Sequence, residues 1–209
     1  MMPFKRIVHA IGFLGFVCLF GWEAWAVHEG GRLRVLPEES RVEFVASYSF
    51  VSHHLNIGGE MQGLLKIRSG DSNMNIVDPA KGKPVEIVID ARSMDTGNRW
   101  RDTRIKNEYL EVEKFSEIRF RLTRVEGIHG LRDIGEGSNR TVEGWLTLHG
   151  VTRRIMTKAR LANRDRRIMV DGETTVPMSR FGMKLPKAPP FLTGRDDVKV
   201  KFHIVLEGH

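Results

Sequence analysis

The fold class is decided by the stretch Val198–Glu207, which has the sequence VKVKFHIVLE. Every second residue from Val198 to Leu206 is apolar, and the residues between them are mostly charged or polar. Because the side chains of a strand alternate between its two faces, this period of two predicts a strand with one apolar face. Such a strand is typical of an antiparallel sheet that packs one face on a core and exposes the other to water.

The same alternation recurs upstream in segments that turn-like sequences separate. These segments are Arg41–Tyr48, Gly63–Arg68, Val85–Asp90, Glu117–Leu122, Thr141–Leu148, Arg154–Leu161 and Ile168–Val176. With Val198–Glu207 they make about eight predicted strands, each with one apolar face. The sequence therefore predicts an all-β protein, either a closed barrel or a sandwich.

Two segments depart from this period. From Asn98 to Leu110, aromatic and aliphatic residues recur at helical spacing behind the turn Asp95-Thr96-Gly97-Asn98, which predicts one or two short helices. The stretch Phe181–Arg195 contains prolines at 186, 189 and 190. Proline lacks the backbone donor that helices and strands use, so we expect a loop there, long enough to cover an opening.

The N-terminus has the layout of a signal peptide. Lys5 and Arg6 precede an apolar run from Ile7 to Phe20, and Ala24-Trp25-Ala26 supplies the small residues that signal peptidase accepts. We therefore expect cleavage after Ala26 and an exported domain over residues 27–209, periplasmic or secreted. An uncleaved membrane anchor is the alternative for Met1–Ala26, because length alone does not separate the two.

Composition narrows the function classes. The only cysteine of the 209 residues, Cys18, lies in the apolar run, so neither a disulfide nor a thiolate zinc site is expected in the exported domain. The chain carries a net charge of +7, but its arginines are spread among acidic residues over strand faces and loops. This distribution is typical of a solvated outer face, so we expect no nucleic acid partner. Transient contact with an anionic membrane surface is a minority alternative.

Three short motifs have structural explanations. Asp95-Thr96-Gly97 matches the tripeptide of aspartic proteases, but it occurs once and lacks their sequence context, so a helix-start turn is expected. Adjacent His53 and His54 would point to opposite faces of a strand, which disfavours a shared metal ion. His149 precedes Gly150 at a strand end, where a polar turn residue is expected and a polar cap at the mouth of a lumen is the alternative.

Several stretches match a known pattern in the same order along the chain. They are Pro37–Phe44, Gly63–Ile67, Val85–Ala91, Met94–Asn98 with Arg101-Asp102, Val112–Phe120, Val142–Thr152 and Ser179–Met183. The chain thereby resembles the YceI-like (polyisoprenoid-binding) family. The resemblance implies an exported bacterial protein with an extended, lipocalin-like barrel of eight antiparallel strands that holds a long isoprenoid or quinone-like chain. Trp145, Trp100 and the loop Pro186–Phe191 depart from the family pattern.

The apolar strand faces and the resemblance together predict a carrier or sequestering protein, not an enzyme. An eight-stranded barrel is just wide enough to hold one slim ligand or to be filled by its own side chains. We expect no catalytic residue, no metal and no cofactor other than an isoprenoid or quinone-like lipid ligand. The predicted ligand-binding residues are Phe44, Ile67, Ile89, Phe120, Leu146, Leu148, His149, Phe181 and Phe202.

Two other function classes stay open. An enzyme acting on an amphipathic substrate in the same barrel would require polar groups that converge inside the lumen. A structural or interaction protein would use exposed Trp145 and Trp100 as a partner surface, for example in a homodimer.

Overall fold

The computed structural model of the protein describes residues 33–52, 55–69, 71–72, 84–130, 133–188 and 192–208. The predicted signal peptide, Met1–Ala26, and the pair His53-His54 lie outside these residues, as do residues 189–191 of the loop that departs from the family pattern. Within the described ranges, no helix is both long enough and apolar enough to cross a membrane.

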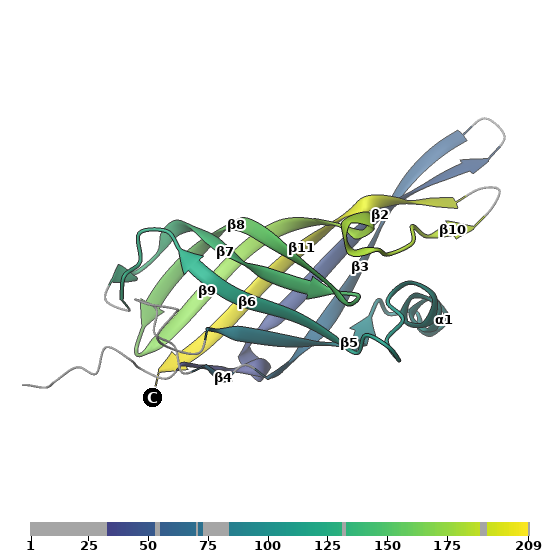
Figure 1. Cartoon of the computed structure of the whole chain (residues 1–209). Coiled ribbons are helices and arrows are strands. Elements are labelled where there is room, and N and C mark those ends of the chain that lie inside the picture. The colour runs from purple at the N-terminus through teal and green to yellow at the C-terminus, as the bar shows by residue number, and fades with distance from the viewer. Residues whose placement is uncertain are drawn as a thin grey trace, which may run out of the picture.

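Antiparallel strands form a closed ring (Figure 1). Each strand pairs with the next, and the last, β11, also pairs with β2, which closes the ring. The predicted eight-stranded barrel is therefore confirmed, and the sandwich alternative is wrong, because closure leaves no free sheet edge. In ring order the strands are β2 (Arg41–Ser52), β3 (Leu55–Ser69), β5 (Glu86–Asp95), β6 (Glu117–Val125), β7 (Ser138–Leu148), β8 (Val151–Arg164), β9 (Arg167–Pro177) and β11 (Leu192–Gly208).

Every segment with a period of two falls on one of these strands, and the bounds differ most at the start of β3. The pairing of these two strands continues to Ser52 opposite Leu55, well before the predicted strand start at Gly63. Figure 1 shows their hairpin projecting beyond the ring. The alternation is lost in this projection because no core face requires it there.

The prediction that Phe181–Arg195 contains no regular structure is wrong in part. Lys187–Ala188 forms the short strand β10, which pairs with Leu192 and Thr193 at the start of β11. Strand β11 therefore begins before the alternating stretch that revealed it, and its first residues pair with β2. The physical reason is that Lys187 and Ala188, unlike the prolines around them, keep their backbone N–H groups. These groups can pair with the backbone of the neighbouring strand.

The helix predicted over Asn98–Leu110 is confirmed. Helix α1 (Arg99–Arg104) continues directly into one π-helical turn, η2 (Ile105–Tyr109). The Asn98 side chain caps α1 by accepting a 3.1 Å hydrogen bond from the backbone N–H of Arg101. Ahead of it, Asp95-Thr96-Gly97 forms the expected turn, in which the Asp95 carboxylate accepts a hydrogen bond from the backbone N–H of Gly97.

The remaining small elements lie at the two ends of the barrel. Strand β1 (Leu33–Val35) pairs with the last residues of β11 and with β4 (Asp71–Ser72), next to the 3-10 turn η1 (Pro37–Glu39). At the opposite end, the 3-10 turn η4 (Met178–Phe181) follows β9. Figure 1 places α1 at one end of the ring and β4 with the C-terminus at the other.

One carboxylate is buried on the outer wall. Glu143 of β7 is 5% exposed and lies between Arg124 of β6 and Arg154 of β8. Arg154 bonds one carboxylate oxygen, and Nη2 of Arg124 lies 3.0 Å from the other. The hydrogen bond from Arg154, followed by that from Arg124, holds the pKa of Glu143 below its ordinary value.

This buried carboxylate predicts acid sensitivity. A carboxylate whose pKa is lowered by folding stabilises the fold above its unfolded pKa, and this stabilisation is lost as the pH falls through the folded pKa. Glu143→Gln should therefore lower the free energy of unfolding at neutral pH and weaken its decline between about pH 5 and about pH 1. Urea denaturation over this pH range measures both effects.

Glu60→Gln is the matched control, because Glu60 is exposed on β3 and forms no ion pair with the described residues. It should reproduce the pH dependence of the unchanged protein. If Glu143→Gln does the same, the outer-wall carboxylate does not contribute to acid sensitivity.

Candidate functional site

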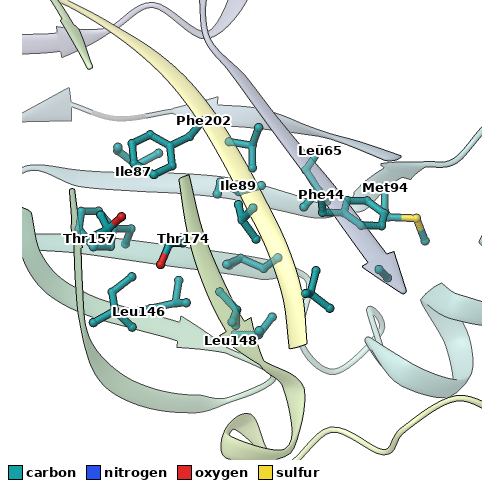
Figure 2. Close-up of a pocket in the computed structure, with 18 of the residues that line it drawn as sticks. Phe44, Leu65, Ile87, Ile89, Met94, Leu146, Leu148, Thr157, Thr174 and Phe202 are labelled. Carbon is teal, nitrogen blue, oxygen red and sulfur yellow. The ribbon is translucent and has the colours of Figure 1, made fainter. Parts of the chain in front are cut away.

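The barrel encloses a cavity of about 660 Å³. All eight ring strands contribute to its wall, and this volume lies within the range of ordinary small-molecule sites. Figure 2 shows the labelled side chains from several strands around the cavity, most of them hydrocarbon, with a sulfur atom in Met94 and hydroxyl oxygens in Thr157 and Thr174. The apolar wall includes Val42, Phe44, Met61, Leu65, Ile87, Ile89, Ile118, Phe120, Leu122, Val142, Leu146, Leu148, Ile155, Val170, Val176, Val198, Val200, Phe202 and Ile204.

Glycines on neighbouring strands keep the large rings of this wall close to the backbone. Phe44 lies across from Gly63, and Phe202 lies across from Gly172. A Cβ atom added to either glycine would approach ring atoms of its phenylalanine closer than 3.0 Å. Phe120 covers Gly144 in the same way. The rings thus occupy the space above the glycines, which leaves the centre of the lumen open.

The cavity is closed at one end and open at the other. Ile128 and Ile134, from the segment between β6 and β7, are each 5% exposed and cover the closed end. At the other end the lining comes from α1, η2, η4 and the start of β11, and it includes Trp100, which is 75% exposed. A lining residue this exposed marks the mouth, so a ligand chain would enter beside α1.

Polar lining groups are few and unevenly placed. Thr157 and Thr174 lie among the hydrocarbon side chains in Figure 2, and the Thr157 hydroxyl donates a 2.8 Å hydrogen bond to the backbone carbonyl of Glu173. The charged lining residues are Arg101, Arg104 and Arg195, all at the mouth. No cluster of metal-ligating side chains occurs in the part of the chain that the structure describes.

The structure brings most of the predicted ligand-binding residues together. Those that line the cavity are Phe44, Ile89, Phe120, Leu146, Leu148 and Phe202. They come from five different strands and share only their place on the inner face, which is what the period of two identified. Contact with a ligand stays a prediction for each of them.

Ile67 and Phe181 have a different place. Ile67 is 6% exposed and Phe181 is 2% exposed, and both belong to the buried core without lining the cavity. Phe181 lies in η4 and is one of the largest fully buried side chains among the described residues. Periodicity identifies the apolar face of a segment but not the depth of a residue along the barrel axis, so it could not separate Ile67 from the lumen.

His149 also lies outside the lining. It sits in the β7–β8 turn with a positive φ of 51°, its Nε2 lies 2.8 Å from Oε2 of Glu111, and its ring packs on Phe115. His149 thus lies at the turn position that the sequence predicted. It does not line the cavity, so it does not form the alternative polar cap at the mouth of the lumen. Hydrogen bonds from Lys114 and then His149 lower the pKa of Glu111. The contact joins the β7–β8 turn to the segment after η2.

The mouth residues were missed at the sequence level. Arg195, Arg104 and Tyr109 line the cavity, yet none belongs to an alternating segment. Trp100 and Trp145 were expected to be exposed, and Trp145 is 44% exposed on the outer face of β7. Only Trp100 reaches the cavity. The sequence indicated the open end only through the proline-containing stretch Phe181–Arg195, which was expected to cover an opening and which contributes Pro186 and Arg195 to the lining.

These features define a class, a lipocalin-like barrel with an apolar lumen that opens at one end. The chain belongs to the YceI-like family, whose domain it matches over residues 33–206. A UPF0312 protein of Vibrio parahaemolyticus is 34% identical over 115 residues, 54% of this chain and 56% of that protein. Protein YceI of Salmonella arizonae is 28% identical over 126 residues, 59% of this chain and 61% of that protein. The chain thus spans little more than half the length of such curated relatives.

Solved structures share the fold. A polyisoprenoid binding domain from Saccharophagus degradans gives a TM-score of 0.63 at 18% identity and covers 85% of this chain and 98% of its own. BcnA of Burkholderia cenocepacia gives 0.56 at 18% identity, with coverages of 82% and 98%. The Campylobacter jejuni YceI protein gives 0.55 at 19% identity, with coverages of 77% and 91%. At these identities the similarity establishes the fold alone.

The ring-on-glycine packing predicts a steric cost. In Gly172→Ala the new Cβ would press on the Phe202 ring and lie 3.0 Å from the Lys158 carbonyl oxygen, so the ring must turn into the lumen. We expect a loss of about 1–3 kcal/mol in the free energy of unfolding, as for other overpacked sites. Chemical denaturation measures this loss.

Gly58→Ala is the control, because the nearest atom to its new Cβ is 4.0 Å away. It should be neutral or slightly stabilising, since alanine reduces the entropy of the unfolded chain. Equal effects of the two substitutions would show that the ring contact does not constrain the wall.

Proposed function

We propose that the protein is an exported carrier or sequestering protein that binds a lipid with a long isoprenoid or quinone-like chain. The observation that supports this most directly is the apolar cavity of about 660 Å³, closed at one end and open beside α1. A filled barrel would serve as a scaffold only, whereas an open apolar lumen suits a slim hydrocarbon chain. The name of the Saccharophagus degradans domain is consistent with a polyisoprenoid ligand.

The energetics suit such a ligand without any polar contact. Each buried methylene contributes about 0.8 kcal/mol, so about ten of them give on the order of 8 kcal/mol before the cost of association. This is enough for useful affinity along the apolar wall. It also allows the head of the lipid to stay at the mouth, where the lining is polar.

A carrier is favoured over an enzyme by the chemistry of the wall. Among the described lining residues there is no histidine, aspartate or glutamate, the side chains that most often move protons in catalysis. The lining threonines are separate from the mouth arginines, so polar groups do not converge on one point deep in the lumen. We therefore assign the cavity to binding.

Export is proposed from the N-terminal sequence. The layout of Met1–Ala26 predicts delivery to the periplasm or the medium, and residues 27–209 contain no cysteine that would require a defined redox state there. Mass determination of the protein purified from the periplasmic fraction tests this, and a mature chain starting at Val27 is expected.

A bound lipid is the central prediction. Native mass spectrometry of the exported protein should show an added mass that solvent extraction recovers as an apolar lipid. Thr174→Phe, which places a ring in the lumen, should lower lipid occupancy at least several-fold while keeping the fold, because Thr174 lines the cavity. Thr175→Phe is the matched control on the exposed face of the same strand and should retain the lipid. Recovery of only empty protein under lipid-preserving conditions would overturn the carrier proposal.

Contact with an anionic membrane surface during ligand exchange is part of the same proposal. Trp100 is 75% exposed at the mouth, and Cζ of Arg104 lies 6.0 Å from its ring centroid, a combination that suits the interface of a charged bilayer. Flotation with anionic vesicles should decrease in Trp100→Ala and at high salt, whereas Trp145→Ala should float like the unchanged protein. Flotation that persists in high salt would exclude headgroup attraction.

The interaction-protein alternative has a separate test. Trp145, 44% exposed and opposite Arg121 and Arg154, would have to lie in a homodimer or partner interface. A monomeric mass in solution for both the unchanged protein and Trp145→Ala would dismiss the homodimer.

A further inference from the structure

The charge of the cavity lining is entirely of one sign. Arg101, Arg104 and Arg195 line the mouth, and no aspartate, glutamate, lysine or histidine among the described residues lines any part of the cavity. The rest of the described wall is apolar except for hydroxyl groups. A ligand whose chain fills the lumen would therefore have its head among three guanidinium groups, here called the mouth arginines.

A bulge in β11 places Arg195. The pairing of β11 with β2 passes from Gly194 opposite Tyr48 to Val198 opposite Ala46, so the intervening residues have no counterpart on β2. Bulges at barrel rims redirect side chains in this way. The neighbouring Asp196 turns to η4, where it accepts hydrogen bonds of 2.7 Å and 2.6 Å from the backbone N–H and the hydroxyl of Ser179. Arg195 forms no ion pair with any described carboxylate.

The turn before α1 positions Arg101. Its Nε and Nη2 donate hydrogen bonds of 2.8 Å to the hydroxyl and the carbonyl oxygen of Thr96, which are neutral acceptors. Thr96 is itself held by the buried carboxylate of Asp102, which accepts from its backbone N–H at 3.1 Å. The Asp102 carboxylate is occupied by the turn and does not line the cavity. Asp102 and Thr96 are thus positioning residues for Arg101.

Only one mouth arginine has a carboxylate partner. Nε of Arg104 lies 2.9 Å from Oε2 of Glu108, one turn along the helix, in a half-exposed pair. Asp95 accepts from the backbone N–H of Gly97, and Asp196 accepts from Ser179 of η4. Asp95, Glu108 and Asp196 are thus engaged outside the cavity, and no carboxylate of the described residues lines it.

We propose that the mouth arginines select an amphiphile with an anionic oxygen head, a phosphate or a carboxylate, over a neutral lipid of the same chain. Guanidinium groups bind such heads through paired, charge-assisted hydrogen bonds. A neutral head would leave Arg101 and Arg195 partly desolvated without a counter-charge. This inference rests on the proposed lipid-binding function and adds the chemical class of the head.

Matched ligands test the proposal on the whole exported protein after lipid extraction. Calorimetric titration compares geranylgeranyl phosphate with geranylgeraniol, and palmitate with hexadecanol, so that only the head differs within each pair. We expect the anionic member of at least one pair to bind about tenfold or more tightly, and this preference should shrink as the ionic strength rises from about 0.01 M to about 0.15 M. A preference confined to one pair identifies the head as phosphate or carboxylate.

Variants locate the effect. Arg195→Met should reduce affinity for the preferred anion about tenfold and leave the neutral ligand unchanged, whereas Arg195→Lys should retain most of the preference. Arg121→Met removes an exposed arginine from the outer wall and should change neither affinity. Thermal unfolding of each variant without ligand confirms that the fold is kept.

The outcomes separate this proposal from the one on which it rests. Equal binding of charged and neutral ligands, or an anion preference that Arg195→Met leaves intact, would overturn the role of the mouth arginines while the carrier function stands. Failure of all four ligands to bind the extracted protein would overturn both.

Discussion

The hollow interior depends on the packing of large rings against glycine backbone. Phe44, Phe120 and Phe202 are large inner-face side chains that line the cavity, and each covers a glycine on the neighbouring strand. With any larger residue at these glycines, the rings would have to point into the lumen and fill it, since an eight-stranded barrel has little room to spare. The glycines thus allow the rings to lie against the wall. This leaves a cavity where a solid apolar core would otherwise form.

The mouth depends on departures from regular strand geometry. A bulge turns Arg195 inward, an Asx-capped turn carries Arg101 and Trp100 on α1, and η4 is held to the bulge by Asp196. These irregular segments collect at one end of the ring, whereas Ile128 and Ile134, buried lining residues from the segment between β6 and β7, cover the other. The result is a lumen with an apolar depth and a cationic entrance, which suits an amphiphile bound in a single orientation.

The predicted site residues that line the cavity are those on strands with a clear alternation of apolar and polar residues. Phe44, Ile89, Phe120 and Leu146 lie on clear alternating segments, and all of them line the cavity. Ile67 satisfies the same pattern but lies in the core away from the lumen, and Phe181 belongs to a 3-10 turn. His149 was recognised as a turn residue, yet its partner Glu111 is far from it in sequence and could not be inferred.

The sequence by itself determined the strands, their inner faces and the short helix, because a period of two and a capped turn are local properties of the chain. Even the family followed from these local stretches and their order. Only the tertiary structure decided that the ring closes from β11 to β2, that glycines lie under the rings, and that the arginines gather at one mouth. Each of these results from pairing between distant segments, and the register of that pairing is not encoded in any one of them.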